Sequence, residues 1–174
     1  ENGICRHANN INMNNAPLVK EFRKYLDIPV TLENDANAAA YGEYKINGGG
    51  ADSFVFITLG TGIGGGVIIN GKLYKGFNGV GAELGHTVIC SGGNLCTCGR
   101  KGCWEAYASV TALINQTRDA ISKNPQSLMA QISKEDGTVN GKTAFIAAKN
   151  GDIAATEVLN KYFEYIGEGL TNIV

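Results

Sequence analysis

The sequence predicts a mixed α/β fold, and three stretches carry that prediction. Residues 29–33 (PVTLE) and 53–59 (SFVFITL) have the apolar, β-branched composition of strands. The first runs directly into an alanine-rich helical pattern, and the second leads into a glycine-rich turn. From residue 104 onward, apolar residues recur at helical spacing. Strands that alternate with helices in this way are typical of α/β proteins.

The N-terminal stretch begins with a polar, asparagine-rich segment over residues 1–15, which predicts turns and a surface loop. Pro17 is expected to begin a helix at its first position. That helix should pack one face on a core, because its apolar residues recur at helical spacing: Leu18, Val19, Phe22, Tyr25 and Leu26. It should end before Pro29, where the first strand starts.

Asp35 falls where the first strand meets the next helix, in the run ENDANAAA over residues 33–40. One interpretation is an N-cap, since aspartate accepts a hydrogen bond from a free helical N–H. The other is a general base, because open α/β folds bind ligands beyond the ends of their strands. A single carboxylate can serve both purposes.

Residues 60–66 (GTGIGGG) follow the second strand and precede the apolar residues 67–69 and the turn Asn70-Gly71. The spacing of Gly60, Gly62 and Gly65 fits G-x-G-x-x-G, but a strand follows and not a helix, which excludes a dinucleotide fingerprint. Asn-Gly between extended runs predicts a hairpin. The glycines can serve only a tight turn, or their bare N–H groups can hold a phosphate together with the Thr61 hydroxyl. Five glycines in seven positions favour the phosphate interpretation.

The sequence GVGAELGHTVICSGGNLCTCGRKGCWE over residues 79–105 places three thiols and an imidazole close together. Three cysteines and one histidine make a complete tetrahedral zinc set, and thiolates select zinc over calcium or magnesium. The alternatives are disulfides or buried thiols, but three thiols cannot all pair among themselves. We therefore predict a closed zinc site whose ligands are His86, Cys96, Cys98 and Cys103. Such a metal would hold a loop and thereby position Glu83 and Glu105.

The C-terminal third is predicted to be helical. Residues 104–123 form one helix with Glu105 in its first turn, and a short helical piece follows around Met129. Residues 143–149 and 153–166 form two more helices. Gly151 should stop the first of these, and Asp152 should cap the second.

Composition excludes some classes of function. The 174 residues include fifteen basic and sixteen acidic side chains, for a net charge of −1. This balance predicts no binding of nucleic acid or of an anionic membrane. The sequence has no signal-peptide pattern, and five cysteines with metal-like spacing suit a reducing compartment, so we expect a cytoplasmic protein. Cys5 and Cys90 are expected to be packed thiols.

Four motifs together resemble the ROK family of sugar kinases and sugar-responsive repressors. Residues 33–38 (ENDANA) look like the family's sugar and base motif, and residues 59–66 (LGTGIGGG) look like its second phosphate loop. Residues 83–86 (ELGH) and 96–105 (CTCGRKGCWE) look like its E-x-G-H and C-x-C-G-x-x-G-C-x-E signatures. Each motif alone is modest, but four in this order are highly specific, and the match covers nearly the whole chain.

The resemblance implies an actin-like ATPase (ribonuclease-H-like) fold of two α/β domains with a cleft between them. It implies that Asp35 is the catalytic base and that sugar hydroxyls are bound by Asn34, Asp35, Glu83, His86 and Glu105. Asn10 is a further candidate for sugar contact, although its surroundings depart from the family's pattern. His86 would serve both zinc and sugar. The phosphates of ATP, with Mg²⁺, would lie on Gly60, Thr61, Gly62 and Gly64. A homodimer is also implied.

Two family motifs are missing, an N-terminal D-x-G-G-T phosphate loop and a late Gly-Gly adenosine motif. The first residue is also Glu and not Met. We therefore expect a piece of a longer protein, with residues 1–34 ending a first, smaller domain and residues 35–174 belonging to the larger one. This piece alone is expected to bind zinc, to bind sugar at most weakly, and to lack ATP turnover.

The function expected of the intact protein is ATP-dependent phosphorylation of a hexose, with glucose to glucose 6-phosphate as the leading candidate. A hydroxyl is a poor nucleophile at neutral pH, so a carboxylate must accept its proton as the O–P bond forms. The alternative is a sugar-sensing ROK repressor without kinase activity. A third interpretation is a zinc-stapled interaction domain, which leaves the two glutamates beside the metal loop without a purpose.

Overall fold

The computed structural model describes residues 3–8 and 13–174 of the chain, which divide into two compact units. One unit comprises Glu1–Phe54 and Gly66–Ala82, and the other comprises Val55–Gly65 and Glu83–Val174. We refer to them as the strand–helix unit and the helical unit. The boundary between them crosses two strands, so each strand contributes residues to both units.

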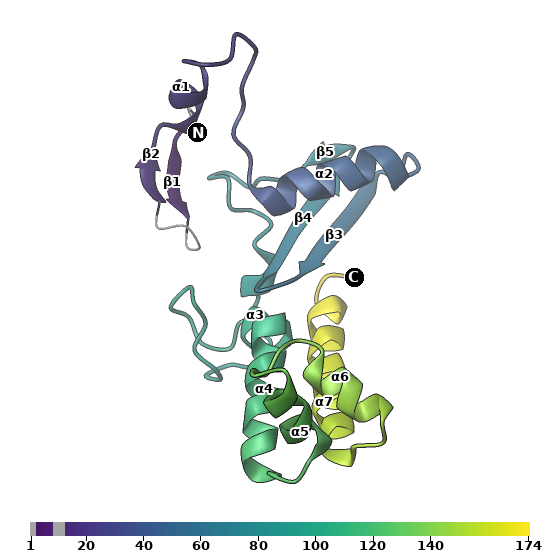
Figure 1. The fold of residues 1–174 in the computed structure, drawn as a ribbon. Helices are drawn as coiled ribbons and strands as arrows, with labels where there is room; N and C mark the ends of the chain where they lie inside the picture. The colour runs from purple at the N-terminus through teal and green to yellow at the C-terminus, as the bar shows by residue number, and fades with distance from the viewer. Residues whose placement is uncertain (1–2, 9–12) are drawn as a thin grey trace. The chain divides into compact units, whose positions relative to one another are not determined.

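The strand–helix unit begins with an antiparallel hairpin, β1 (Cys5–Ala8) and β2 (Met13–Ala16), in which Cys5 pairs with Ala16 (Figure 1). Helix α1 (Leu18–Phe22) follows Pro17, as predicted, but it ends five residues later and none of its residues is buried. Tyr25 is 83% exposed and Phe22 is 53% exposed, so the predicted packing of this face is wrong. A short amphipathic helix depends on a surface to bury its apolar face, and here Leu18 and Val19 are only partly buried.

Residues 29–34 form no strand, contrary to the prediction from PVTLE. Helix α2 (Asp35–Asn47) begins immediately after them. Its N-cap is Asn34, whose side-chain oxygen accepts from the Asn37 N–H at 3.0 Å, so Asp35 is the first helical residue and not the cap. Ala40 on the buried face of α2 packs against Gly66, where an added Cβ would lie less than 3.0 Å from the Ala40 Cβ.

The sheet has the order β3-β4-β5, formed by β3 (Ser53–Leu59), β4 (Ile63–Ile69) and β5 (Lys72–Leu73). β3 has the predicted bounds. β4 starts at Ile63, earlier than predicted, so the last three glycines of the glycine-rich stretch lie inside a strand. β4 and β5 pair antiparallel, with Ile68 opposite Leu73. Asn70 and Gly71 have φ of 51° and 71°, the positive values that a tight hairpin turn requires.

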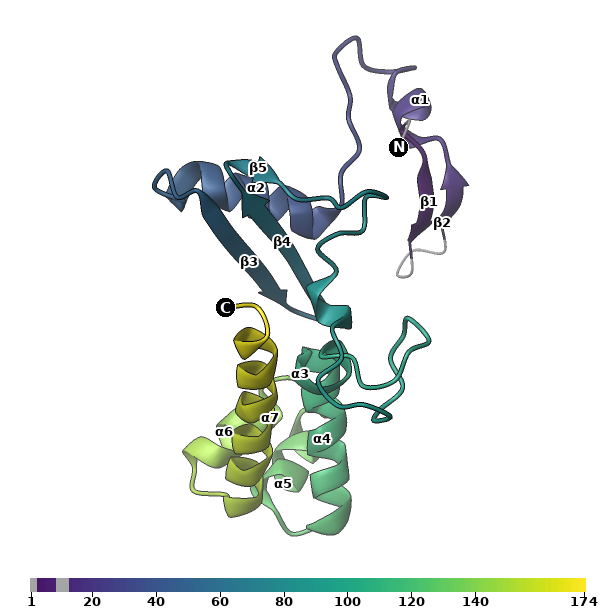
Figure 2. The same cartoon turned by 180° about the vertical axis from the view of Figure 1, so that it is seen from behind.

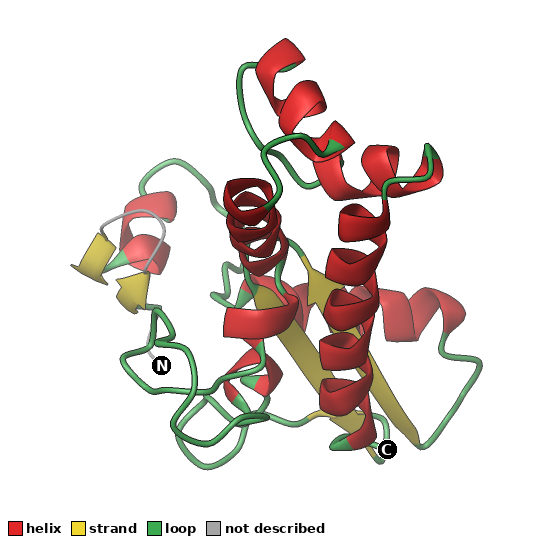
Figure 3. Cartoon of the chain, turned by 90° about the horizontal axis from the view of Figure 1, so that it is seen from below, coloured by secondary structure: helices red, strands yellow, loops and turns green. Residues whose placement is uncertain are grey.

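Helices dominate the other unit, as Figures 2 and 3 show. The predicted helix over 104–123 is in fact two helices, α3 (Glu105–Ala108) and α4 (Val110–Lys123). The break falls at Ser109, whose hydroxyl accepts from the Ala112 N–H at 3.1 Å, because serine competes with the helix for backbone partners and favours caps. A short 3₁₀ turn, η1 (Leu84–His86), precedes them.

The remaining helices are α5 (Leu128–Glu135), α6 (Thr143–Lys149) and α7 (Ile153–Thr171). α6 has the predicted bounds, and α7 extends five residues beyond its predicted end. Gly151 has a φ of 87°, and Asp152 accepts from the Ala155 N–H at 2.8 Å, so the predicted stop and cap are both confirmed. A core cluster packs α4, α5, α6 and α7 together through Leu113, Met129, Ala144, Ala147, Ala155, Leu159 and Tyr162.

In the part of the chain that the structure describes, no helix is long and apolar enough to span a membrane.

Candidate functional site

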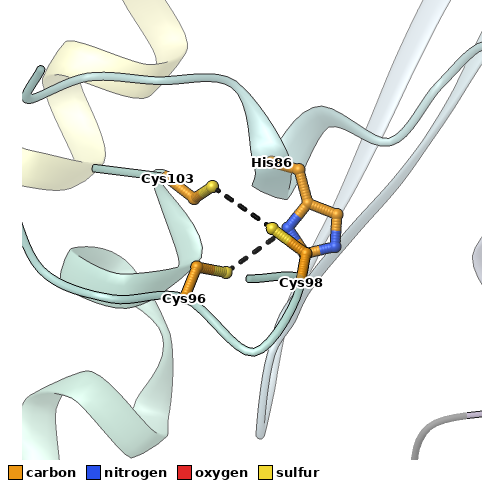
Figure 4. A group of neighbouring side chains, drawn as sticks. All are labelled: His86, Cys96, Cys98 and Cys103. Carbon is orange, nitrogen blue, oxygen red and sulfur yellow. Dashed lines mark hydrogen bonds between the residues drawn. The ribbon is translucent and has the colours of Figure 1, made fainter. Parts of the chain in front are cut away.

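The predicted metal ligands meet in the helical unit. Their ligand atoms lie within 4.8 Å of one another, with His86 on η1 and the three thiols on the loop that follows (Figure 4). Cys96 Sγ lies 3.6 Å from His86 Nδ1, and Cys98 Sγ lies 3.6 Å from Cys103 Sγ. All five cysteines are free, which excludes the disulfide alternative.

This cluster has the dimensions of a tetrahedral zinc site. Bonds of about 2.3 Å to sulfur and about 2.0 Å to nitrogen give tetrahedral edges of about 3.8 Å between two sulfurs and about 3.5 Å between sulfur and nitrogen. The two measured separations of 3.6 Å match those edges. Three thiols and one imidazole complete four-coordination with no position left for a substrate, which is the arrangement of a structural site.

The loop is folded around the cluster by its own backbone. The Cys96 N–H donates to the Arg100 carbonyl at 2.8 Å, and the Gly99 N–H donates to the Cys96 carbonyl at 2.9 Å. Gly99 has a φ of 84° and Gly102 a φ of 86°, values that L side chains rarely adopt. An added Cβ at Gly102 would also lie less than 3.0 Å from the Cys90 carbonyl.

Two of the thiols have altered acidity. Burial raises the pKa of Cys103 to about 12, whereas the backbone N–H of Arg100 lowers the pKa of Cys98. A metal ion binds the thiolate form, so binding at this loop must release protons and is expected to weaken as pH falls.

Glu105, the first residue of α3, is half-buried and uses both of its carboxylate oxygens within the helical unit. Oε2 accepts from the Ile63 N–H at 2.9 Å, and Oε1 accepts from the Thr97 hydroxyl at 3.0 Å. Glu83 is exposed and precedes η1, where its carbonyl accepts from the His86 N–H at 3.0 Å. The two glutamates therefore flank the metal cluster in sequence and belong to the same unit.

Trp104, predicted from the sequence only as the start of a helix, anchors the end of the metal loop to the helical core. It is 0% exposed, and its Nε1–H donates to the Tyr165 carbonyl of α7 at 2.8 Å. It lies between Cys103 of the cluster and the acid Glu105, so it connects both to the helical core. Its position as the single tryptophan in the chain, inside the cysteine motif, is the signal that could have predicted this role.

The glycine-rich turn between β3 and β4 is held by neighbouring helices. The Gly60 carbonyl accepts from the Val110 N–H at 2.9 Å, and the Thr61 carbonyl accepts from the Thr111 hydroxyl at 2.7 Å. Among the predicted phosphate donors, the Gly60 N–H is used within the turn and the Gly64 N–H donates to the Thr58 hydroxyl at 3.2 Å. Within the described chain, the amides of Thr61 and Gly62 have no protein partner. These two amides and the Thr61 hydroxyl are the donors that the turn offers to an anion.

The predicted base lies in the strand–helix unit. Asn34 and Asp35 are exposed at the start of α2, and Asp35 Oδ1 accepts from the Ala36 N–H at 2.9 Å. Glu33 accepts from the Asn34 N–H at 3.1 Å and forms an ion pair with Lys75. Burial opposes ionisation of Glu33, but the hydrogen bonds from Lys75 and the Asn34 backbone outweigh it and lower the pKa of this carboxyl. Asn10, the remaining candidate, lies outside the described residues.

Comparison with known proteins identifies the family, because the ROK family profile matches residues 1–174. The chain belongs to the ROK family. A glucokinase from Streptomyces coelicolor is 41% identical over 95% of this chain and 54% of its own length. The xylose repressor of Bacillus subtilis is 38% identical over 95% of this ROK chain and 39% of its own length.

Among solved structures, a ROK glucokinase from Streptomyces griseus in complex with glucose and AMPPNP superposes with a TM-score of 0.84. It is 39% identical, over 99% of this chain and 56% of that one. The ROK chain described here spans about half the length of the glucokinases that it matches. It has the α/β, actin-like ATPase fold predicted from its motifs, in a partial copy.

Proposed function

We propose that the protein containing this chain is an ATP-dependent hexose kinase, with glucose as the leading substrate. The observation that carries the proposal is the likeness, over nearly the whole chain, to a glucokinase solved with glucose and an ATP analogue. The glycine-rich turn supports it independently, because Thr61 and Gly62 offer adjacent amides that have no partner in the described part of the chain, as a phosphate site needs.

Asp35 is the proposed general base. Its carboxylate accepts the proton of the sugar hydroxyl while that oxygen forms its bond to the γ-phosphorus and the bond to the ADP leaving oxygen breaks. Its carboxylate is exposed in the first turn of α2, where Oδ1 accepts from the Ala36 N–H at 2.9 Å, so it is accessible to a substrate hydroxyl. Asn34 precedes it, and its side-chain oxygen is occupied by the helix cap, so its amide N–H groups remain to donate to the sugar.

Glu83, Glu105 and His86 are the proposed partners of the remaining hydroxyls, and Asn10 is a candidate for one more. Hydrogen bonds from several such groups fix the orientation of the reacting hydroxyl, which can lower the barrier by several kcal/mol, of order 7–11 at the limit.

Two ions complete the proposal. Zinc would be held by His86, Cys96, Cys98 and Cys103, where it would order the loop that leads into Glu105. Mg²⁺ would accompany ATP and neutralise charge that develops on its phosphates. We also propose a cytoplasmic homodimer that binds no nucleic acid through this segment, in which residues 1–34 end the first domain and residues 35–174 belong to the second.

The second candidate function is a sugar-sensing transcriptional regulator, and one observation favours it. A xylose repressor matches the same region of the chain, with the rest of that protein lying outside the match. The metal and sugar residues would then serve ligand control, and Asp35 would bind sugar without catalysis.

The test is ATP-dependent phosphorylation of a panel of hexoses by the full-length protein, beside its Asp35→Asn variant. A kinase should turn over one sugar, and the variant should lose about 10²–10⁴-fold in kcat while it still binds that sugar. Asp27→Asn makes the same change at another exposed aspartate of the strand–helix unit and should keep its activity. Sugar binding without turnover on any hexose would support the regulator instead. Turnover by residues 1–174 alone would contradict the expectation that this piece is inactive.

A further inference from the structure

Glu105 connects two segments that lie far apart in the sequence. One oxygen of its carboxylate accepts from Ile63, which is 42 positions away at the end of the glycine-rich turn. The other oxygen accepts from Thr97, which stands between the metal ligands Cys96 and Cys98. That second oxygen also lies 3.7 Å from Cys96 Sγ. A single side chain therefore touches both the turn and the metal loop.

The turn is shaped to receive this carboxylate. An added Cβ at Gly62 would lie less than 3.0 Å from Glu105 Oε2, so any other residue there would displace the acid or the turn. Gly62, like Thr61, has an amide with no partner among the described residues. The Glu105 carboxylate thus lies directly against the part of the turn that offers donors to an anion.

The other described hydrogen bonds of the turn do not reach the metal loop. Val110 and Thr111 of α4 donate to the carbonyls of Gly60 and Thr61, the Gly60 N–H donates to the Gly62 carbonyl, and the Gly64 N–H donates to the Thr58 hydroxyl. Among the described contacts of the turn, only the hydrogen bond from the Ile63 N–H to Glu105 connects it to that loop. The position of Ile63 at the end of the turn is therefore linked to the metal loop through Glu105.

We propose that Glu105 is a positioning residue for the glycine-rich turn and that Thr97 holds it there, so that the metal loop controls the donors offered to phosphate. This rests on the proposed function of the turn as a phosphate site. It does not compete with sugar binding by Glu105, because a carboxylate has about four acceptor positions and the contacts from Ile63, Thr97 and Cys96 use three of them.

The test compares Thr97→Val, Thr97→Ser and Thr87→Val in the full-length protein. The valine at 97 removes the hydroxyl at nearly constant volume, serine restores it, and Thr87→Val removes a hydroxyl next to His86 that does not touch Glu105. Three quantities are measured: zinc content, hydrogen exchange at the Ile63 amide, and the separate KM values for ATP and for the sugar.

Thr97→Val should retain one zinc per chain and should exchange the Ile63 amide about 3- to 10-fold faster, with a similar rise in the KM for ATP and a smaller change for sugar. Serine at 97 should restore both values, and Thr87→Val should leave them unchanged. Unchanged exchange at Ile63 in the zinc-loaded Thr97→Val protein would overturn the proposal. Equal effects of Thr87→Val would also overturn it, since they would indicate general loosening of the loop. If the wild-type protein shows no turnover, the kinase proposal fails but the exchange measurement still decides this one.

Discussion

Substituting Gly169 by alanine should destabilise the helical unit and the metal loop, because Gly169 on α7 packs against the indole of Trp104. An added Cβ at Gly169 would lie less than 3.0 Å from three atoms of the indole, Cε2, Cδ2 and Nε1. Trp104 is fully buried and cannot move aside without displacing Cys103 or Glu105, its neighbours in the chain. Gly167 is the matched control, because it lies on the same helix and an added Cβ there meets nothing within 4 Å.

The magnitudes can be worked from these contacts. Overpacking a buried site costs about 1–3 kcal/mol, and displacing the indole weakens its bond to the Tyr165 carbonyl, worth about 1 kcal/mol. Replacing a helical glycine by alanine contributes at most about 1 kcal/mol in the other direction. Gly169→Ala should therefore lower the free energy of unfolding by about 2 kcal/mol, because the overpacking and the weakened hydrogen bond together exceed the gain in helix propensity. Gly167→Ala should raise it by up to about 1 kcal/mol.

Denaturant unfolding of the zinc-loaded protein, followed by tryptophan fluorescence, measures both variants directly, since Trp104 is the single tryptophan. Zinc affinity, measured by competition with a chelator, should fall for Gly169→Ala and stay constant for Gly167→Ala. If the two variants are equally stable, the contact between Gly169 and the indole has no energetic importance, and the reasoning is refuted.

Three further predictions concern the metal, a helix cap and an ion pair. Chelation of the metal should lower the Tm and abolish sugar binding; unchanged sugar affinity in a metal-free sample would contradict the role given to the loop. Asp152→Ala should cost about 2 kcal/mol in urea unfolding, because its carboxylate accepts from Ala155 at 2.8 Å and from the start of α5 at 2.6 Å; Asp152→Asn keeps one acceptor and should cost less. The folded-state pKa of Glu33 lies below its ordinary value of 4.5, so its pair with Lys75 stabilises the fold above that pH and loses this effect as pH falls through the lowered pKa. The difference in unfolding free energy between wild type and Lys75→Met should therefore shrink as pH falls. A difference that stays constant with pH would show that the ion pair does not cause it.

The sequence predicted best what depends on nearby residues. The cluster of one histidine and three cysteines could be predicted because all four residues lie within eighteen positions. The Asn70-Gly71 hairpin could be predicted because its positive φ angles demand those residue types. The break at Ser109 was missed because helical spacing continues across it, and only the cap reveals it.

What depends on distant contacts could not be predicted. The link from Glu105 to Ile63 joins positions that no local pattern relates. The strand expected over residues 29–33 also failed for this reason, because β-branched composition describes a segment that fits a sheet and cannot supply a neighbouring strand.

The glycines inside β4 limit how this strand can diverge. Gly65 and Gly66 are consecutive, so they face opposite sides of the sheet. A Cβ on Gly65 would meet Leu84, and a Cβ on Gly66 would meet Ala40, each at less than 3.0 Å. A larger residue at either position requires a smaller or shifted partner on that side. The two partners belong to different elements, because Leu84 is on η1 and Ala40 is on α2. Replacement at these positions in related proteins should therefore occur in compensated pairs, with substitutions at Ala40 accompanying those at Gly66 and substitutions at Leu84 accompanying those at Gly65.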